Sequence, residues 1–164
     1  MENPIAIANY FINKANADEV EITPMKLVKL VYIAHGWYLA LNGNPLISEN
    51  VQAWKYGPVI QSLYYATKDY GKSPIKSQIS GFLGGLSFSV GIPTITDNSL
   101  TPFLDKIWDT YKKFDGPQLS TMTHQAGTPW HFTWYTLGGK DKLGAIIPDN
   151  VIKEHYLAKS NQKK

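Results

Sequence analysis

The segment from Pro24 to about Leu41 constrains the fold most strongly, because apolar residues cover more than half of its circumference when it is drawn as an α-helix. An amphipathic surface helix has a narrower apolar stripe. We therefore expect a central, largely buried helix that ends at Asn42-Gly43. Its apolar residues are Leu27, Val28, Leu30, Val31, Tyr32, Ala34, Tyr38, Leu39 and Leu41.

Two lysines, Lys26 and Lys29, lie near the start of this helix. The positive end of the helix dipole makes that position unfavourable for a cation. We therefore expect an anionic group, either a side chain of this protein or part of a partner, beside these lysines.

Prolines mark the expected helix starts, since proline is tolerated at the first helical position. Four of them follow a good capping residue, in the pairs Asn3-Pro4, Thr23-Pro24, Thr101-Pro102 and Thr128-Pro129. We expect Gly57-Pro58 to form a sharp strand-to-helix turn that opens a helix over 59–70, and Asp149 to cap a last helix reaching about Lys159. An architectural role is assigned to Thr23, Pro24, Gly57, Pro58, Thr128 and Pro129.

Two other segments carry signals for small β elements. Residues 48–56 contain a short alternating pattern, which is typical of a strand or an extended loop. Residues 77–99 contain four glycines and a β-branched stretch interrupted by Pro93, which predicts a loop or a small irregular hairpin. The predicted fold is mainly α: a compact helical bundle with an irregular β or loop element around 48–56 and 77–99.

Length and charge predict the domain organisation. The 164 residues, 43% of them hydrophobic and 18% charged, suit one globular domain. The net charge is +3, and all sixteen basic residues are lysines. Four lysines and one glutamate lie from Lys153 onward, so residues 1–152 carry no net charge. We expect one domain over 1–152 and a basic helix end and tail over 153–164 that can be deleted without loss of the fold.

Several function classes are disfavoured by what the sequence lacks. There is no cysteine, so disulfides, thiol nucleophiles and thiolate metal sites are excluded. No apolar run approaches the roughly 20 residues that span a bilayer, and the N-terminus lacks the pattern of a signal peptide. We expect a cytoplasmic protein without a membrane partner.

No catalytic signature occurs, since GxGxxG, GxxxxGK[ST], GxSxG and HExxH are all missing. His35 is expected to be a hydrogen-bonded histidine of the interior, and His155 to be solvated. The alternative hypothesis is a hydrolase or metal-dependent enzyme that uses Thr123, His124 and His131. We expect no catalytic residue, metal or cofactor.

Specific nucleic-acid binding is not expected, because the chain has no arginine for base contacts and its body is neutral. A DNA-binding autoregulator that uses the lysine tail is the weaker alternative.

Several aromatic residues fall outside the expected regular helices. Tryptophan and tyrosine are enriched at interface hot spots, so this group suggests a surface that binds a partner. The same residues could equally wedge loops onto the bundle. They are Trp54, Tyr56, Trp130, Phe132, Trp134 and Tyr135.

Three blocks of the sequence stand in a recognisable order. The first is TPMKLVKLVY (23–32), followed by GWYL (36–39) and GNPL (43–46). The second is AWKYGPV (53–59), followed by Leu63-Tyr64. The third contains Leu119-Ser120, Thr123-His124 and Pro129-Trp130. These motifs span about residues 20–135, and in this order they resemble the Panacea domain of SocA-like antitoxins, a family that includes phage- and mobile-element-associated proteins.

The resemblance implies a mainly helical protein that binds and neutralises a toxin encoded beside it. It also implies two routes: direct interaction, or delivery of the toxin to a Clp-type protease. The family pairs one scaffold with many unrelated toxins. The candidate partner-binding residues are Lys26, Trp54, Lys55, Tyr56, His124 and Trp130.

Overall fold

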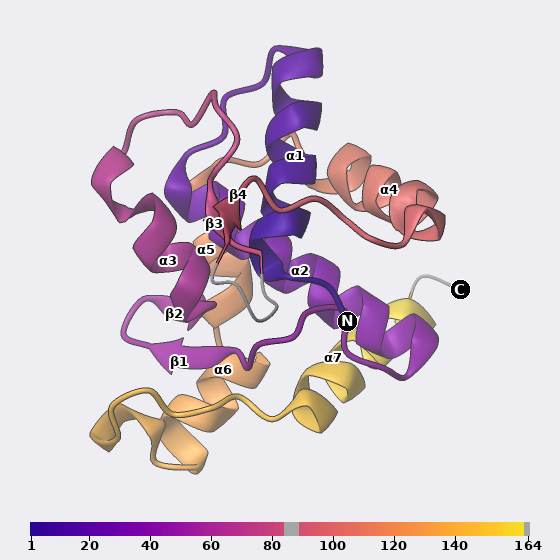
Figure 1. Cartoon of the computed structure of the whole chain (residues 1–164). Coiled ribbons are helices and arrows are strands. Elements are labelled where there is room, and N and C mark those ends of the chain that lie inside the picture. The colour runs from indigo at the N-terminus through magenta and orange to yellow at the C-terminus, as the bar shows by residue number, and fades with distance from the viewer. Residues whose placement is uncertain (84–88, 163–164) are drawn as a thin grey trace.

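A computed structural model describes residues 1–83 and 89–162. The expected mainly α fold is confirmed (Figure 1). The helices are α1 (Pro4–Asp18), α2 (Pro24–Asn42), α3 (Gln61–Thr67), α4 (Thr101–Tyr111), α5 (Gly116–His124), α6 (Pro129–His131) and α7 (Asp149–Gln162). The strands are β1 (Gln52–Trp54), β2 (Gly57–Val59), β3 (Gly81–Phe82) and β4 (Val90–Gly91).

Helix α2 is the centre of the molecule, as its apolar circumference predicts. It packs against α1, α3, α4, α5, α7 and β2. Figure 1 shows α2 crossing the middle of the structure, with the β1–β2 hairpin near one end and α7 near the other. The helix ends at Asn42, where Gly43 adopts a positive φ of 78°. Leu41 is the exception within the predicted stripe, because its side chain is exposed.

Three of the four predicted helix starts are confirmed by their caps. The side chains of Asn3, Thr23 and Thr128 accept hydrogen bonds from backbone N–H groups of α1, α2 and α6. The helix start at Thr101-Pro102 is also confirmed, because α4 begins at Thr101, but Thr101 does not cap the helix, which directly follows a 3-10 turn over Asn98–Leu100. Asp97 caps that turn by accepting from the backbone N–H of Ser99, so the helical path starts earlier than expected.

The expected strand-to-helix turn at Gly57-Pro58 is also wrong, because both residues lie in β2. The chain reverses two residues earlier, at Lys55 and Tyr56, and β1 pairs with β2 in antiparallel register with Ala53 opposite Pro58. The Ala53 N–H donates to Ala145 on the far side of β1. Ala53 and Pro58 therefore form a non-hydrogen-bonded pair, in which proline removes no ladder bond. Helix α3 starts only at Gln61.

The glycine-rich segment forms the predicted small hairpin, in which β3 pairs with β4. Gly84 and Gly85, which contributed to that prediction, lie outside the described residues. The buried side chain of Asn9 ties this segment to α1. Its Nδ2 donates to the carbonyls of Ile79 (2.9 Å) and Pro93 (3.0 Å), and its Oδ1 accepts from the Ile79 N–H (2.7 Å).

The C-terminal segment forms α7, which packs along α2 and continues to Gln162. The Tyr156 side chain is 3% exposed and its ring lies 5.1 Å from that of Trp37. At Gly36 the two helices come so close that a Cβ would stand 2.2 Å from the Tyr156 ring. His35, buried as expected, bonds to Asp149 through Nε2 at 3.0 Å. Lys163 and Lys164 lie outside the described residues.

His155 is not the solvated side chain that the sequence suggested. It is half-buried on α7, and burial lowers its pKa, with Lys159 adding to the effect. No helix in the described ranges is long and apolar enough to cross a membrane.

The packing of Tyr156 predicts that α7 contributes strongly to stability. Tyr156→Ala should lower the free energy of unfolding by about 3–5 kcal/mol, the usual loss when a large buried aromatic side chain is removed. Urea unfolding followed by circular dichroism measures this change. The matched control is Tyr70→Ala at an exposed tyrosine, which should stay within about 0.5 kcal/mol of the native chain. Equal stabilities for the two variants would show that α7 is an accessory after all.

Candidate partner-binding surface

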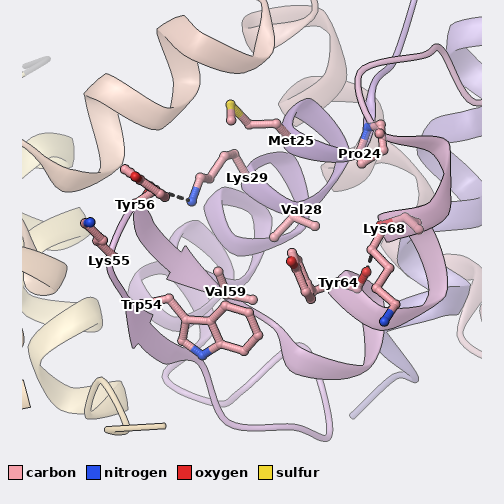
Figure 2. A pocket seen from close by; sticks show the side chains of 12 residues that line it. Pro24, Met25, Val28, Lys29, Trp54, Lys55, Tyr56, Val59, Tyr64 and Lys68 are labelled. Atoms are coloured by element: carbon pink, nitrogen blue, oxygen red, sulfur yellow. Dashed lines mark hydrogen bonds between the residues drawn. The ribbon is translucent and has the colours of Figure 1, made fainter. Parts of the chain in front are cut away.

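The turn of the β1–β2 hairpin borders three hollows. The first, about 400 Å³, lies between the hairpin, the start of α2 and α3, and we call it the lysine pocket (Figure 2). The second, about 640 Å³, lies between the turn and the α5–α6 region, and we call it the histidine groove. The third, about 870 Å³, lies between β1, α3 and residues 140–144, and we call it the loop groove. Together they form the hairpin face.

Side chains from three helices hold the turn in place. Lys29 of α2 donates through Nζ to the carbonyls of Pro58 (2.9 Å) and Tyr56 (3.4 Å). Ser120 of α5 also donates to the Tyr56 carbonyl, at 3.2 Å. The indole N–H of Trp130 in α6 donates to the Trp54 carbonyl at 2.6 Å. The turn is therefore fixed to the helical core from several directions.

The two lysines at the start of α2 are buried and donate to backbone carbonyls, and Asp115 is the anionic side chain whose charge acts on Lys26. Lys29 and Lys26 are each 4% exposed. Burial lowers the pKa of Lys29 from its ordinary value of 10.5 to about 7. The Lys26 ammonium donates to the Lys112 carbonyl at 2.6 Å, and burial lowers its pKa too, while the charge of Asp115 opposes that shift.

Five of the six candidate residues meet on the hairpin face. Lys55, Tyr56, His124 and Trp130 line the histidine groove, and Trp54 borders the other two hollows. Lys26 does not join them, because its side chain is buried and its ammonium bonds to the chain after α4.

Both interpretations of the loop aromatics apply, but to different side chains. Trp130 is a wedge: it is buried, and its ring stacks on Trp134 with centroids 5.3 Å apart. Tyr56 is 69% exposed at the turn, and Tyr135 is also exposed on the π-helical turn after α6. These two tyrosines present aromatic surface to the solvent.

Sequence reasoning missed several residues of this surface. Tyr64 and Tyr65 of α3 and the fully exposed Leu143 are the main examples. A signal for the tyrosines was available. Leu63 is buried in α3, and the next two residues of a helix point about 100° and 200° away from it, so they face away from the core. Leu143 lies in a loop, where no periodic pattern indicates exposure.

The residues of the alternative hydrolase hypothesis lie in α5 and α6. The Thr123 hydroxyl is buried and donates to the Leu119 carbonyl within α5 at 2.9 Å. His124 and His131 do share the histidine groove. Ser120 lies 3.4 Å from His124 Nδ1, but its hydroxyl holds the Tyr56 carbonyl. Within the described ranges, no group of three His, Asp or Glu residues is arranged to hold a metal ion.

The low pKa of Lys29 predicts a pH dependence of stability. Between about pH 7 and 10.5 the folded chain has released a proton that the unfolded chain still holds, so the free energy of unfolding rises with pH. Lys29→Met removes this proton. Relative to that variant, the native chain should gain up to about 1.4 kcal/mol per pH unit across the window.

Urea unfolding at about pH 7 and about pH 9 measures this difference. Lys55→Met, at an exposed lysine, is the control and should parallel the native chain. A Lys29→Met difference that does not change with pH would contradict the proton release.

Comparison with known proteins places these features in a family. The family model for the antitoxin SocA-like Panacea domain matches residues 27–131. The antitoxin SocA of Caulobacter vibrioides (strain NA1000 / CB15N) is 31% identical over 153 residues, which cover 92% of this chain and 80% of that protein. No solved structure gives a significant match. The matched segment contains most of α2, the β1–β2 hairpin, α3, α5 and α6, and the chain therefore belongs to the SocA-like antitoxin family.

Proposed function

We propose that this protein binds and neutralises a toxin encoded beside it, and that the hairpin face is the surface that makes the contact. One observation carries the proposal: exposed aromatic and apolar side chains gather around a turn that three helices hold in place. Large apolar side chains grouped on a surface are typical of sites that bind another protein. The exposed members are Tyr56, Tyr64, Tyr65, Tyr135 and Leu143.

The preorganisation of the turn supports this proposal. The carbonyls of Trp54, Tyr56 and Pro58 accept hydrogen bonds from side chains of α2, α5 and α6. A rigid surface loses little conformational entropy on binding, so more of its contact energy contributes to affinity. The candidate contacts are therefore Trp54, Lys55, Tyr56, His124 and Trp130, of which the buried Trp130 acts by holding the turn.

Charge on the hairpin face indicates the chemistry of the partner. Lys55, Lys68, Lys140 and Lys142 lie around the hollows, and Asp141 is the acidic residue among them. A surface rich in lysine attracts an acidic partner and speeds their encounter. We infer that the toxin offers a mainly acidic surface.

Two routes to neutralisation begin with this contact. Binding can block the toxin directly, or it can deliver the toxin to a Clp-type protease in the cytoplasm. The name of the relative, antitoxin SocA, supports the antitoxin role that both routes share.

Co-expression with the adjacent gene tests the function. The neighbour should be toxic alone and harmless beside this protein, and Tyr56→Ala should reduce protection, with about a tenfold weaker toxin affinity in calorimetry. Leu41→Ala, at an exposed apolar residue near the other end of α2, is the matched control and should protect fully. A neighbour that is harmless alone, or lethal in the presence of this protein, would refute the antitoxin role.

The level of toxin in protected cells separates the two routes. If the protein blocks the toxin directly, the toxin should accumulate in the complex at an unchanged half-life. If the protein delivers it to a protease, the toxin half-life should shorten, and deletion of the Clp-type protease should restore it together with toxicity.

A further inference from the structure

The lysine pocket combines apolar walls with a one-sided charge. Met25 and Val28 of α2, Trp54 and Val59 of the hairpin, and Tyr64 of α3 form the walls. Figure 2 shows these side chains around the cavity, with Lys29 extending toward the hairpin turn. The volume of about 400 Å³ is in the range of cavities that enclose a ligand group.

Three lysines line the pocket, Lys29 inside and Lys55 and Lys68 at its edge, and none of the described carboxylates lines it. The first two residues of α2, Pro24 and Met25, also border it. The positive end of the dipole of this 19-residue helix therefore adds to the lysine charge. The pocket is positive on an apolar background.

A carboxylate that enters the pocket favours the protonated form of Lys29, because an opposite charge nearby raises the pKa that burial lowers. The protonated side chain has three N–H groups. The carbonyls of Pro58 and Tyr56 accept two of them, and the described residues supply no acceptor for the third. The same bonds occupy the outer edge of β2 at Pro58, so an added β-strand would have to displace Lys29. A ligand therefore enters as side chains and not as an extra strand.

We propose that the lysine pocket anchors the toxin, taking an apolar side chain together with a neighbouring Asp or Glu carboxylate that faces the three lysines. This inference rests on the proposed function and specifies the chemistry of its contact. The apolar side chain fills the volume between Val28, Trp54 and Tyr64. The carboxylate forms charge-assisted hydrogen bonds, which are about twice as strong as neutral ones.

A carboxylate fits this pocket better than a phosphate does. A phosphate needs many donors around it. Here the Thr67 hydroxyl already donates to the Leu63 carbonyl at 2.8 Å. The ammonium groups of Lys55 and Lys68 lie over the rings of Tyr56 and Tyr65, at 5.5 Å and 5.2 Å from their centroids. The apolar walls favour a ligand that is mostly hydrocarbon.

Two variants test the pocket without touching the other hollows. Met25→Trp fills its mouth, and Lys68→Glu reverses the charge at its edge. Both residues are exposed, so the fold should persist, which circular dichroism verifies. Each variant should weaken binding of the purified toxin in calorimetry by about tenfold or more. The matched controls are Leu41→Trp and Lys106→Glu, at exposed positions on α2 and α4, and both should bind like the native chain.

A charge swap identifies the carboxylate. Surface Asp and Glu residues of the toxin that adjoin an apolar residue are changed one at a time to Lys. One such toxin variant should lose binding to the native chain and regain it with Lys68→Glu. If the only toxin carboxylate that matters is the chain terminus, or if inorganic phosphate at millimolar concentration displaces the toxin, the proposed ligand is wrong.

The two proposals fail in different ways. If the native chain binds the toxin and Met25→Trp and Lys68→Glu bind it within about twofold, the anchor is overturned while the antitoxin function stands. If the native chain itself does not bind the toxin, the proposed function fails first.

Discussion

The structure depends on the burial of α2, which carries two lysines into the interior along with its apolar residues. A buried ammonium group is tolerated only where acceptors surround it. Lys26 finds the Lys112 carbonyl after α4, and Lys29 finds the carbonyls of Pro58 and Tyr56. These bonds decide where the neighbouring segments lie, so the helix that makes the core also positions the hairpin and the surface around it.

In this arrangement, side chains of the core form hydrogen bonds directly with the hairpin turn at the surface. Lys29 lies inside, yet it lines the lysine pocket, and Ser120 and Trp130 connect α5 and α6 to the same turn. The hairpin face therefore has a rigid base and exposed side chains. Inhibition by covering a toxin needs such a complementary surface and no catalytic group.

Much of the fold could be predicted from local signals, because the width of the α2 stripe and the caps Asn3, Thr23 and Thr128 act within a few residues. Contacts between segments that are distant in sequence could not be predicted in this way. The basic composition of the C-terminal segment concealed the close approach of Tyr156 to Gly36, and Pro58 could be assigned to a strand only once its pairing with Ala53 was known. The site followed the same division: five candidate residues meet on one face, whereas Lys26 bonds to a carbonyl that is distant in sequence.

Side chains at the hairpin turn lie between the hollows: Lys55 borders all three, and Trp54, at the end of β1, borders two. The carbonyls of the turn, and not its side chains, accept the bonds that attach it to the helices. Natural variation can therefore replace Lys55 or Tyr56 while leaving the attachment intact. Under the proposed function, the scaffold separates what it recognises from how it folds, so a change at a few exposed positions would change the toxin that it binds.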